Sequence, residues 1–156
     1  MTDPNERLTP HFTVREMCGS TSHPEIYNVP PLGEVMDNMR RVCLWLEQLR
    51  QTYAESYCDC EDVPLRVSSG YRSQRLNRAV GGSPTSNHLT GCAADIVCRD
   101  CQQALRYACL VLDYAEVSGE RFDELLVERR GMKYWLHLAV RPTNNRMHVA
   151  VEQVKC

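Results

Sequence analysis

One ten-residue stretch, residues 86–95, holds the side chains best suited to chemistry. Its sequence, Ser-Asn-His-Leu-Thr-Gly-Cys-Ala-Ala-Asp, contains an imidazole, His88, and a carboxylate, Asp95. The small residues between them lead into the apolar pair Ile96 and Val97, a pattern that predicts a short buried strand. A buried carboxylate is costly unless it has a partner. Two partners are open at this point: a metal ion shared with His88, or an ion pair with an arginine.

The composition restricts the possible classes of function. The chain has 156 residues, which is enough for one domain with a hydrophobic core. Its net charge of −2 gives no basic field for binding nucleic acid. No apolar stretch is long enough to span a membrane, and the polar N-terminus lacks the apolar core of a secretory signal. We therefore expect a single domain over residues 1–156, a monomer, synthesised in the cytoplasm and open to later release by lysis.

Cysteines are numerous for a chain without a signal sequence, with nine in all. Free thiols are the default expectation in that setting. Cys58 and Cys60, together with the Cys98 and Cys101 pair, are a possible four-thiolate structural zinc site, although Cys-x-Cys is a poor spacing for one. A disulfide framework is the other alternative, and it is favoured if the protein works outside a cell.

The N-terminal half is predicted to be helical after a loose arm over residues 1–11. Thr13 and Glu16 have the spacing of a capping box, which predicts a short helix. Residues 32–55 are the clearest helix, because apolar side chains recur there at the i, i+3, i+4, i+7 spacing of one buried face. A further helix is expected after Asp100, which has the residue type of an N-cap.

The segment before the 86–95 stretch must bring His88 to its place. Residues 64–68 read as a strand that turns out at residues 69–73. A helix over about 73–80 is expected to end at a pair of glycines. The loop that follows, residues 83–87, delivers His88 to the small-residue strand, and such loops often carry functional residues.

Three strand-like runs close the chain, over residues 122–128, 133–140 and 147–151. The run over 133–140 alternates, with Trp135, His137 and Ala139 on one face and Tyr134, Leu136, Leu138 and Val140 on the other. Turn residues over 141–145 join the last two runs, so an antiparallel meander is expected. Helices followed by strands indicate the α+β class.

Three short motifs lie between residues 68 and 137. Ser-x-His-x-x-Gly-x-Ala-x-Asp covers residues 86–95, Ser-Ser-Gly-Tyr-Arg-Ser precedes it at 68–73, and Trp-Leu-His follows at 135–137. Together they resemble the zinc D-Ala-D-Ala carboxypeptidase family, which includes L-alanyl-D-glutamate endopeptidases of phage lysis systems and D,D-dipeptidases of vancomycin resistance. Leu-Asn-x-x-Val-Gly-Gly, at 76–82, makes the chain most similar to the phage and bacterial branch. The resemblance implies the hedgehog-like α+β fold, an antiparallel sheet with helices packed on it.

The same resemblance implies one catalytic zinc ion. His88, Asp95 and His137 match the family's three ligands. Two imidazoles and one carboxylate leave a fourth position for water, as a catalytic zinc site requires. Arg72 matches an arginine that stabilises the oxyanion of the tetrahedral intermediate. The residues expected to contact substrate are Ser86, Tyr71 and Arg72.

The general base is where the chain departs from part of the family. Many members place an acid three residues before the last histidine, and Tyr134 occupies that position here. Glu128 is the best substitute, because it is expected to lie beside His137 across a hairpin. Glu124 and Asp123 are weaker candidates.

The implied activity is hydrolysis of peptidoglycan stem peptides next to a D-amino acid, of the D-Ala-D-Ala carboxypeptidase or the L-Ala-D-Glu endopeptidase type. The resemblance implies action on the cell wall, with phage-type release as one route to it. Two alternatives stay open. One is a hedgehog-like module that binds zinc and recognises a cell-wall or protein partner without cleaving it. The other is a structural protein whose metal ion only stabilises the fold. A competent base at Glu128 favours the enzyme.

Overall fold

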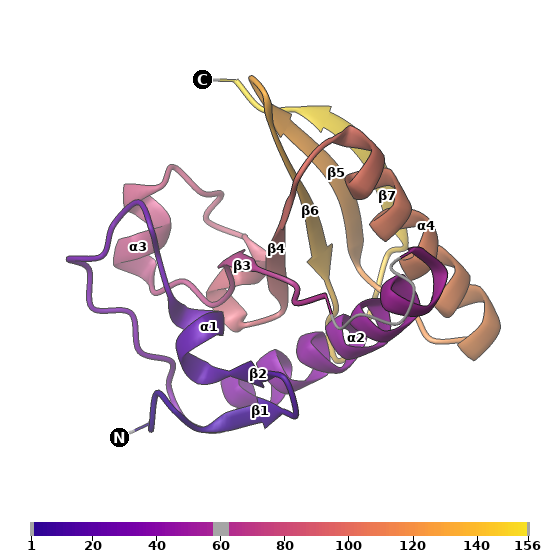
Figure 1. The fold of residues 1–156 in the computed structure, drawn as a ribbon. Helices are drawn as coiled ribbons and strands as arrows, with labels where there is room; N and C mark the ends of the chain where they lie inside the picture. Colours follow the sequence, from indigo (N-terminus) through magenta and orange to yellow (C-terminus); the bar gives the residue numbers. More distant parts are fainter. Residues whose placement is uncertain (1, 58–62, 156) are drawn as a thin grey trace.

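A five-stranded sheet is the centre of the fold in the computed structural model, which describes residues 2–57 and 63–155. Helices pack on this sheet, so the expected α+β class is confirmed (Figure 1). In spatial order the strands are β3 (Val67–Ser69), β4 (Ala93–Cys98), β6 (Lys133–Ala139), β5 (Glu124–Arg130) and β7 (His148–Gln153).

Two long helices, α2 (Glu34–Tyr57) and α4 (Cys101–Ser118), pack against each other and against the sheet (Figure 1). The helix expected over residues 32–55 is confirmed as α2, and its predicted apolar face is buried in the core. Asp100 caps α4 as expected, since its side chain accepts a hydrogen bond from the backbone N–H of Gln103.

The N-terminal segment is ordered by pairing, so the expectation of a loose arm over residues 1–11 is wrong for its described part. β1 (Arg7–Thr9) pairs with β2 (Phe12–Thr13) and packs against α2. Leu8 is buried in the core, and Thr9 donates a hydrogen bond to Glu47. The predicted capping box is confirmed at the start of α1 (Val14–Cys18). A strand of three residues is too short for a periodic pattern, which is why the sequence did not reveal it.

The last strand departs from the predicted meander. β5 and β6 form the expected antiparallel hairpin, but β7 pairs with β5 and runs parallel to it. The edge of β6 that a meander needs is already taken by β4, with Ala93 opposite Ala139. After β6 the chain therefore crosses over to the free edge of β5, where it forms β7. The pairing starts with His148 of β7 opposite Glu124, the first residue of β5.

The sheet has one apolar face and one face that carries polar side chains. Alternate residues of the three central strands enter the core on the helical side. These are Ala94, Ile96, Cys98, Leu125, Val127, Leu136 and Leu138. The residues between them point to the other face, which agrees with the alternation expected for residues 133–140. Every polar residue of this second face is thus held by a strand whose reverse side is anchored in the core.

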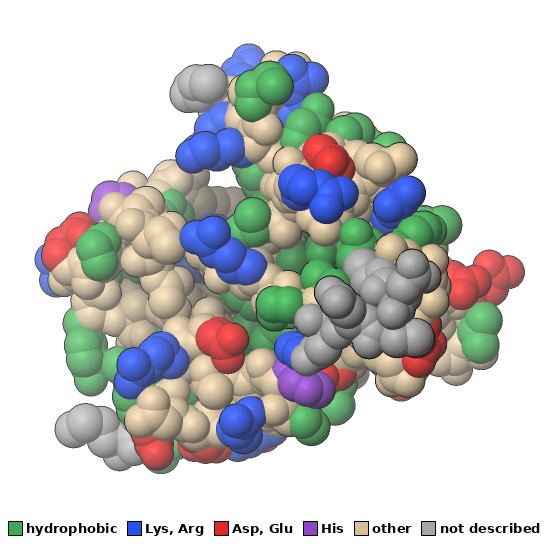
Figure 2. All heavy atoms as spheres, in the orientation of Figure 1, with side chains coloured by type: hydrophobic (Ala, Val, Ile, Leu, Met, Phe, Trp, Pro, Cys, Tyr) green, Lys and Arg blue, Asp and Glu red, His purple; other side chains and the backbone are tan. Residues whose placement is uncertain are grey.

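Short elements border the polar face beyond β4. They are α3 (Gln74–Ala79) and the 3-10 helix η1 (Asn87–Thr90). The strand expected over 64–68 forms its ladder as β3, with Leu65 buried ahead of it. In the described residues no helix is both long and apolar enough to cross a membrane. Charged side chains of both signs are spread over the face seen in Figure 2, consistent with the small net charge.

Candidate metal centre

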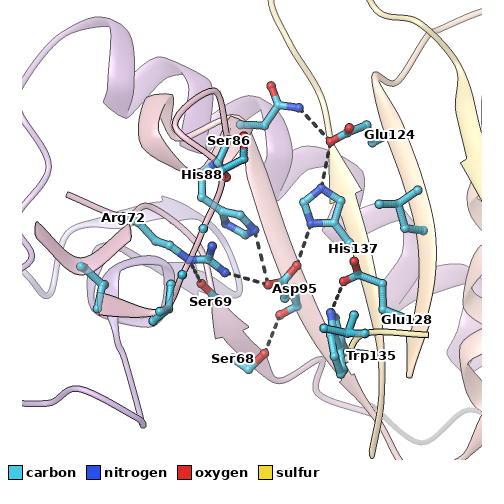
Figure 3. Close-up of a pocket in the computed structure, with 18 of the residues that line it drawn as sticks. Ser68, Ser69, Arg72, Ser86, His88, Asp95, Glu124, Glu128, Trp135 and His137 are labelled. Carbon is cyan, nitrogen blue, oxygen red and sulfur yellow. Dashed lines mark hydrogen bonds and ion pairs between the residues drawn. The ribbon is translucent and has the colours of Figure 1, made fainter. Parts of the chain in front are cut away.

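Three side chains converge on the polar face of the sheet: His88, Asp95 and His137 (Figure 3). Asp95 on β4 lies directly opposite His137 on β6 in the strand register. His88 reaches them from η1, which ends at Gly91. Gly91 has a φ of +74°, and a Cβ on it would lie 2.8 Å from the carbonyl oxygen of Val35, so the chain needs glycine here to turn into β4.

The three side chains are buried and close together. Each offers one ligand atom, and these atoms lie within 4.8 Å of one another. Asp95 Oδ1 is 2.8 Å from His137 Nδ1, and Asp95 Oδ2 is 3.4 Å from His88 Nε2. Only 3% of His88 and 8% each of Asp95 and His137 are exposed. Two imidazoles and one carboxylate form a donor set that suits zinc and leaves a coordination position open.

A backbone carbonyl on the side of the ring away from Asp95 sets the orientation of His88. Its Nδ1 lies 2.7 Å from the carbonyl oxygen of Gly70, an acceptor that fixes the proton on Nδ1 and leaves Nε2 facing Asp95. Gly70 is held against Met17, where an added Cβ would lie 2.3 Å from the Met17 carbonyl oxygen. Ser86 also accepts a hydrogen bond from the backbone N–H of His88 and caps η1. The Gly-Tyr-Arg turn and the histidine loop thus support each other.

Arg72 comes to the same cluster from the turn after β3. Its guanidinium lies 3.2 Å from Asp95 Oδ2 and donates a second hydrogen bond to Ser69 Oγ at 2.8 Å. The buried Asp95 therefore has an arginine as an ion-pair partner and two histidines beside it that could share a metal ion with it. Arg72 occupies only Asp95 Oδ2. The other carboxylate oxygen, Oδ1, faces His137 and is left to serve as a metal ligand.

The charges of the cluster respond to burial and to one another. Burial raises the pKa of Asp95, but the adjacent His88 and His137 outweigh it and hold that pKa well below its usual range. Burial disfavours charge on His137, yet its hydrogen bonds to Asp95 and Glu124 raise its pKa to about 10. Burial lowers the pKa of His88, which keeps its ring neutral. The site therefore presents an ionised carboxylate to any cation that enters.

Two glutamates of β5 flank His137 on the polar face. Glu128 lies opposite Trp135 and accepts a hydrogen bond from its indole N–H. Burial and the nearby Asp95 raise the pKa of Glu128. Glu124 instead accepts a hydrogen bond from His137 Nε2 at 3.2 Å, and this bond, against some burial, lowers its pKa to about 2. Glu128 is thus the carboxylate better prepared to take up and release a proton.

Asp123, the remaining candidate for the base, does not face the cluster. Asp123 is fully buried and accepts hydrogen bonds from Arg146 and Asn87. Tyr134, at the position where many family members have an acid, packs against the hydrophobic core. Neither residue lines the cleft described next.

A cleft of about 640 Å³ opens over the cluster. Arg72, Ser86 and Glu128 line it together with the three metal-competent side chains. Tyr71 does not: its side chain is 8% exposed and belongs to the hydrophobic core. The expectation that Tyr71 contacts substrate is therefore corrected, because the turn that points Arg72 to the cleft points its neighbour inward.

The described residues give no support to a four-thiolate zinc site or to a disulfide framework. Cys58 and Cys60 lie outside them. Cys98 is buried, and burial raises the pKa of its thiol to about 12, whereas Cys101 is exposed at the start of α4. The six cysteines of the described ranges are unpaired thiols.

Reasoning from the sequence missed the polar residues that support the cluster. Asn87 donates to both Asp123 and Glu124, and Arg146 bridges the same two carboxylates. The sequence suggests Glu124 only as a weaker candidate for the base. The two-residue period of β5 would have placed Glu124 on the face of His137, but only the register shows that it reaches the ring.

The comparison with known proteins agrees with this geometry. The family model described as Peptidase M15 matches residues 10–125, about three quarters of the chain. The match includes Arg72, His88 and Asp95 and ends before Glu128 and His137, which the register of the sheet brings to the same place. No curated protein is matched by the sequence. The resemblance read from the motifs and the hedgehog-like fold it implied are thereby confirmed, and the chain belongs to the Peptidase M15 family of zinc metallopeptidases.

Proposed function

We propose that this single-domain protein is a zinc-dependent peptidase that hydrolyses peptidoglycan stem peptides at a bond involving a D-amino acid. The observation that carries the proposal is the convergence of His88, Asp95 and His137 in a cleft that Arg72 and Glu128 also line. Membership of the Peptidase M15 family supports the substrate class. The bond is either D-Ala-D-Ala, at the end of the stem, or L-Ala-D-Glu, within it.

The three converging side chains are the residues that would hold zinc. Their donor atoms match its preference, their burial excludes bulk water from the ligands, and Asp95 supplies negative charge. When bound, zinc acts as a Lewis acid on the amide carbonyl and lowers the pKa of a water molecule at its open position.

Arg72 is proposed to stabilise the charge that develops on the carbonyl oxygen. Its guanidinium is fixed by Asp95 and Ser69, so it needs no reorganisation during the reaction. A preorganised cation in a partly buried cleft stabilises a developing oxyanion more than water does. Ser86, which lines the same cleft, is proposed to contact the substrate backbone.

Glu128 is proposed as the general base and then the general acid. Its raised pKa brings it toward the range in which a carboxylate exchanges protons readily. It takes a proton from the attacking water and passes it to the leaving amine. The hydrogen bond from Trp135 holds the carboxylate on the side of His137.

The test is mass spectrometry of purified muropeptides after incubation with zinc-loaded protein, with a chelated sample as control. Loss of one D-Ala identifies a carboxypeptidase, and a split between L-Ala and D-Glu identifies an endopeptidase. His88→Ala should lose zinc and activity, and Glu116→Gln, on the exposed side of α4, should keep both. No product from several peptidoglycan chemotypes, with zinc bound, would refute the proposal and favour a zinc-binding recognition module.

A further inference from the structure

The imidazole of His137 lies between two carboxylates. Its Nδ1 is 2.8 Å from Asp95 Oδ1, on the side where the three metal-competent side chains converge. Its Nε2 is 3.2 Å from Glu124 Oε2, on the opposite side (Figure 3). A neutral imidazole has one protonated nitrogen, and the hydrogen bond at one nitrogen determines which lone pair is free at the other. The Nδ1 atom of His137 therefore faces the candidate metal site, and its Nε2 atom faces Glu124.

Glu124 is itself held at both carboxylate oxygens. Oε2 accepts a hydrogen bond from Asn87 Nδ2 at 3.0 Å, and Oε1 accepts one from Arg146 at 2.9 Å. Glu124 is the first residue of β5, and its side chain is 22% exposed. A carboxylate fixed at both oxygens has little freedom to rotate away from the ring.

The two groups that hold Glu124 are anchored in turn by Asp123. Its carboxylate is fully buried, accepts from Asn87 Nδ2 at 2.8 Å, and pairs with Arg146 at 2.8 Å. Asn87 immediately precedes His88, so one amide connects the loop of one histidine to the partner of the other. The network thus joins η1, β5 and the crossover before β7 behind the metal-competent cluster.

Glu128 is differently placed. It lies on the same face of β5, but its side chain accepts a hydrogen bond from the indole N–H of Trp135. The two glutamates therefore differ in their hydrogen-bond partners. Glu124 bonds to the His137 ring, whereas Glu128 bonds to Trp135 and faces the cleft beside His137.

We infer that Glu124 is a positioning residue for the metal centre: it accepts a hydrogen bond from His137 Nε2–H and so keeps the Nδ1 lone pair directed at the ion. The inference rests on the proposed zinc site and adds a residue to it. Outer carboxylates of this kind fix the tautomer and orientation of a ligating histidine, and their loss typically weakens metal affinity 10–100-fold.

The first test measures zinc affinity by competition with a chromophoric chelator. Glu124→Ala should bind zinc about 10–100-fold more weakly than the wild type. Glu124→Gln should recover most of the affinity, because a glutamine carbonyl can still accept from Nε2–H. Glu116→Gln, an exposed carboxylate on α4, is the matched control and should bind as the wild type does. Glu124→Ala binding within twofold of the wild type would overturn the inference.

A second readout begins with the wild type, for which the result does not depend on the folding of any variant. Long-range proton–nitrogen NMR spectra of the zinc-loaded protein should place the His137 proton on Nε2, with slow exchange. Glu124→Gln should keep that slow exchange, and Glu124→Ala should lose it. A proton on Nδ1 in the wild type would overturn the inference. A wild type that binds no zinc would refute the metal site itself, whereas a wild type that binds zinc beside an unaffected Glu124→Ala refutes only the role of Glu124.

Discussion

Replacing Asp123 by asparagine should destabilise the protein in a pH-dependent way. The side chain is fully buried and paired with Arg146 and Arg141. Burial raises its pKa, but the hydrogen bonds from Arg146 and Asn87 outweigh it and lower the pKa from 3.8 to about 2. A difference of that size between folded and unfolded states corresponds to about 2 kcal/mol of stability at neutral pH. The larger cost of breaking a fully buried ion pair does not apply, because 52% of the Arg146 side chain is exposed and stays hydrated.

The sign of the pH dependence follows from the lowered pKa. Asp123 contributes its full stabilisation above the pKa of the unfolded chain, and that contribution is lost as the pH falls toward about 2. Urea unfolding of the chelated wild type and Asp123→Asn should therefore differ by about 2 kcal/mol at pH 7 and converge between about pH 4 and pH 2. Asp113→Asn, on the exposed side of α4, is the control. Equal free energies of unfolding at pH 7, or a difference that stays constant down to pH 2, would refute this reasoning.

Three further predictions concern the site. Glu128→Gln should keep zinc affinity and lower kcat about 100-fold or more, measured by muropeptide turnover, because it removes the proton carrier and no ligand; an unchanged kcat would reassign the base. Zinc binding to the metal-free protein at pH 7 should release a proton, because hydrogen bonds raise the pKa of His137 to about 10 and its proton must leave before the ring can ligate. Titration calorimetry in buffers of different ionisation enthalpy measures that release, and heats independent of the buffer would contradict it. Gly70→Ala should lower the melting temperature and the zinc affinity together, because its Cβ would lie 2.3 Å from the Met17 carbonyl oxygen and displace the acceptor of His88. Gly19→Ala is the control, because Gly19 also has no positive φ and its added Cβ would come no nearer than 3.3 Å to another atom.

The helices and the ligand motif were predictable because their signals are local. The apolar repeat of α2 and the capping box at Thr13 depend on residues within one or two turns. The alternation over residues 133–140 placed His137 on the face opposite Leu136 and Leu138, as the structure has it. Spacing within a single strand is enough for such a statement.

The arrangement of the strands was not predictable in the same way. β7 lies parallel to β5 because β4 already occupies the edge of β6, and that depends on a pairing between residues 36 to 46 positions apart. The contact between Glu124 and His137 depends on the exact register of the β5–β6 hairpin, which the alternation within each strand does not fix. Tyr71 and Arg72 are neighbours in one motif, yet only one of them faces the cleft, and the turn geometry that separates them has no periodic signature.

The most direct test of the central claim is a zinc titration of the chelated wild-type protein with muropeptide cleavage as the readout. We expect activity to rise from background and to reach a plateau at one zinc ion per chain, with no activity in His88→Ala at any zinc concentration. Full activity of the chelated protein, or a zinc-saturated wild type without turnover on muropeptides, would contradict the account of this chain as a zinc peptidase.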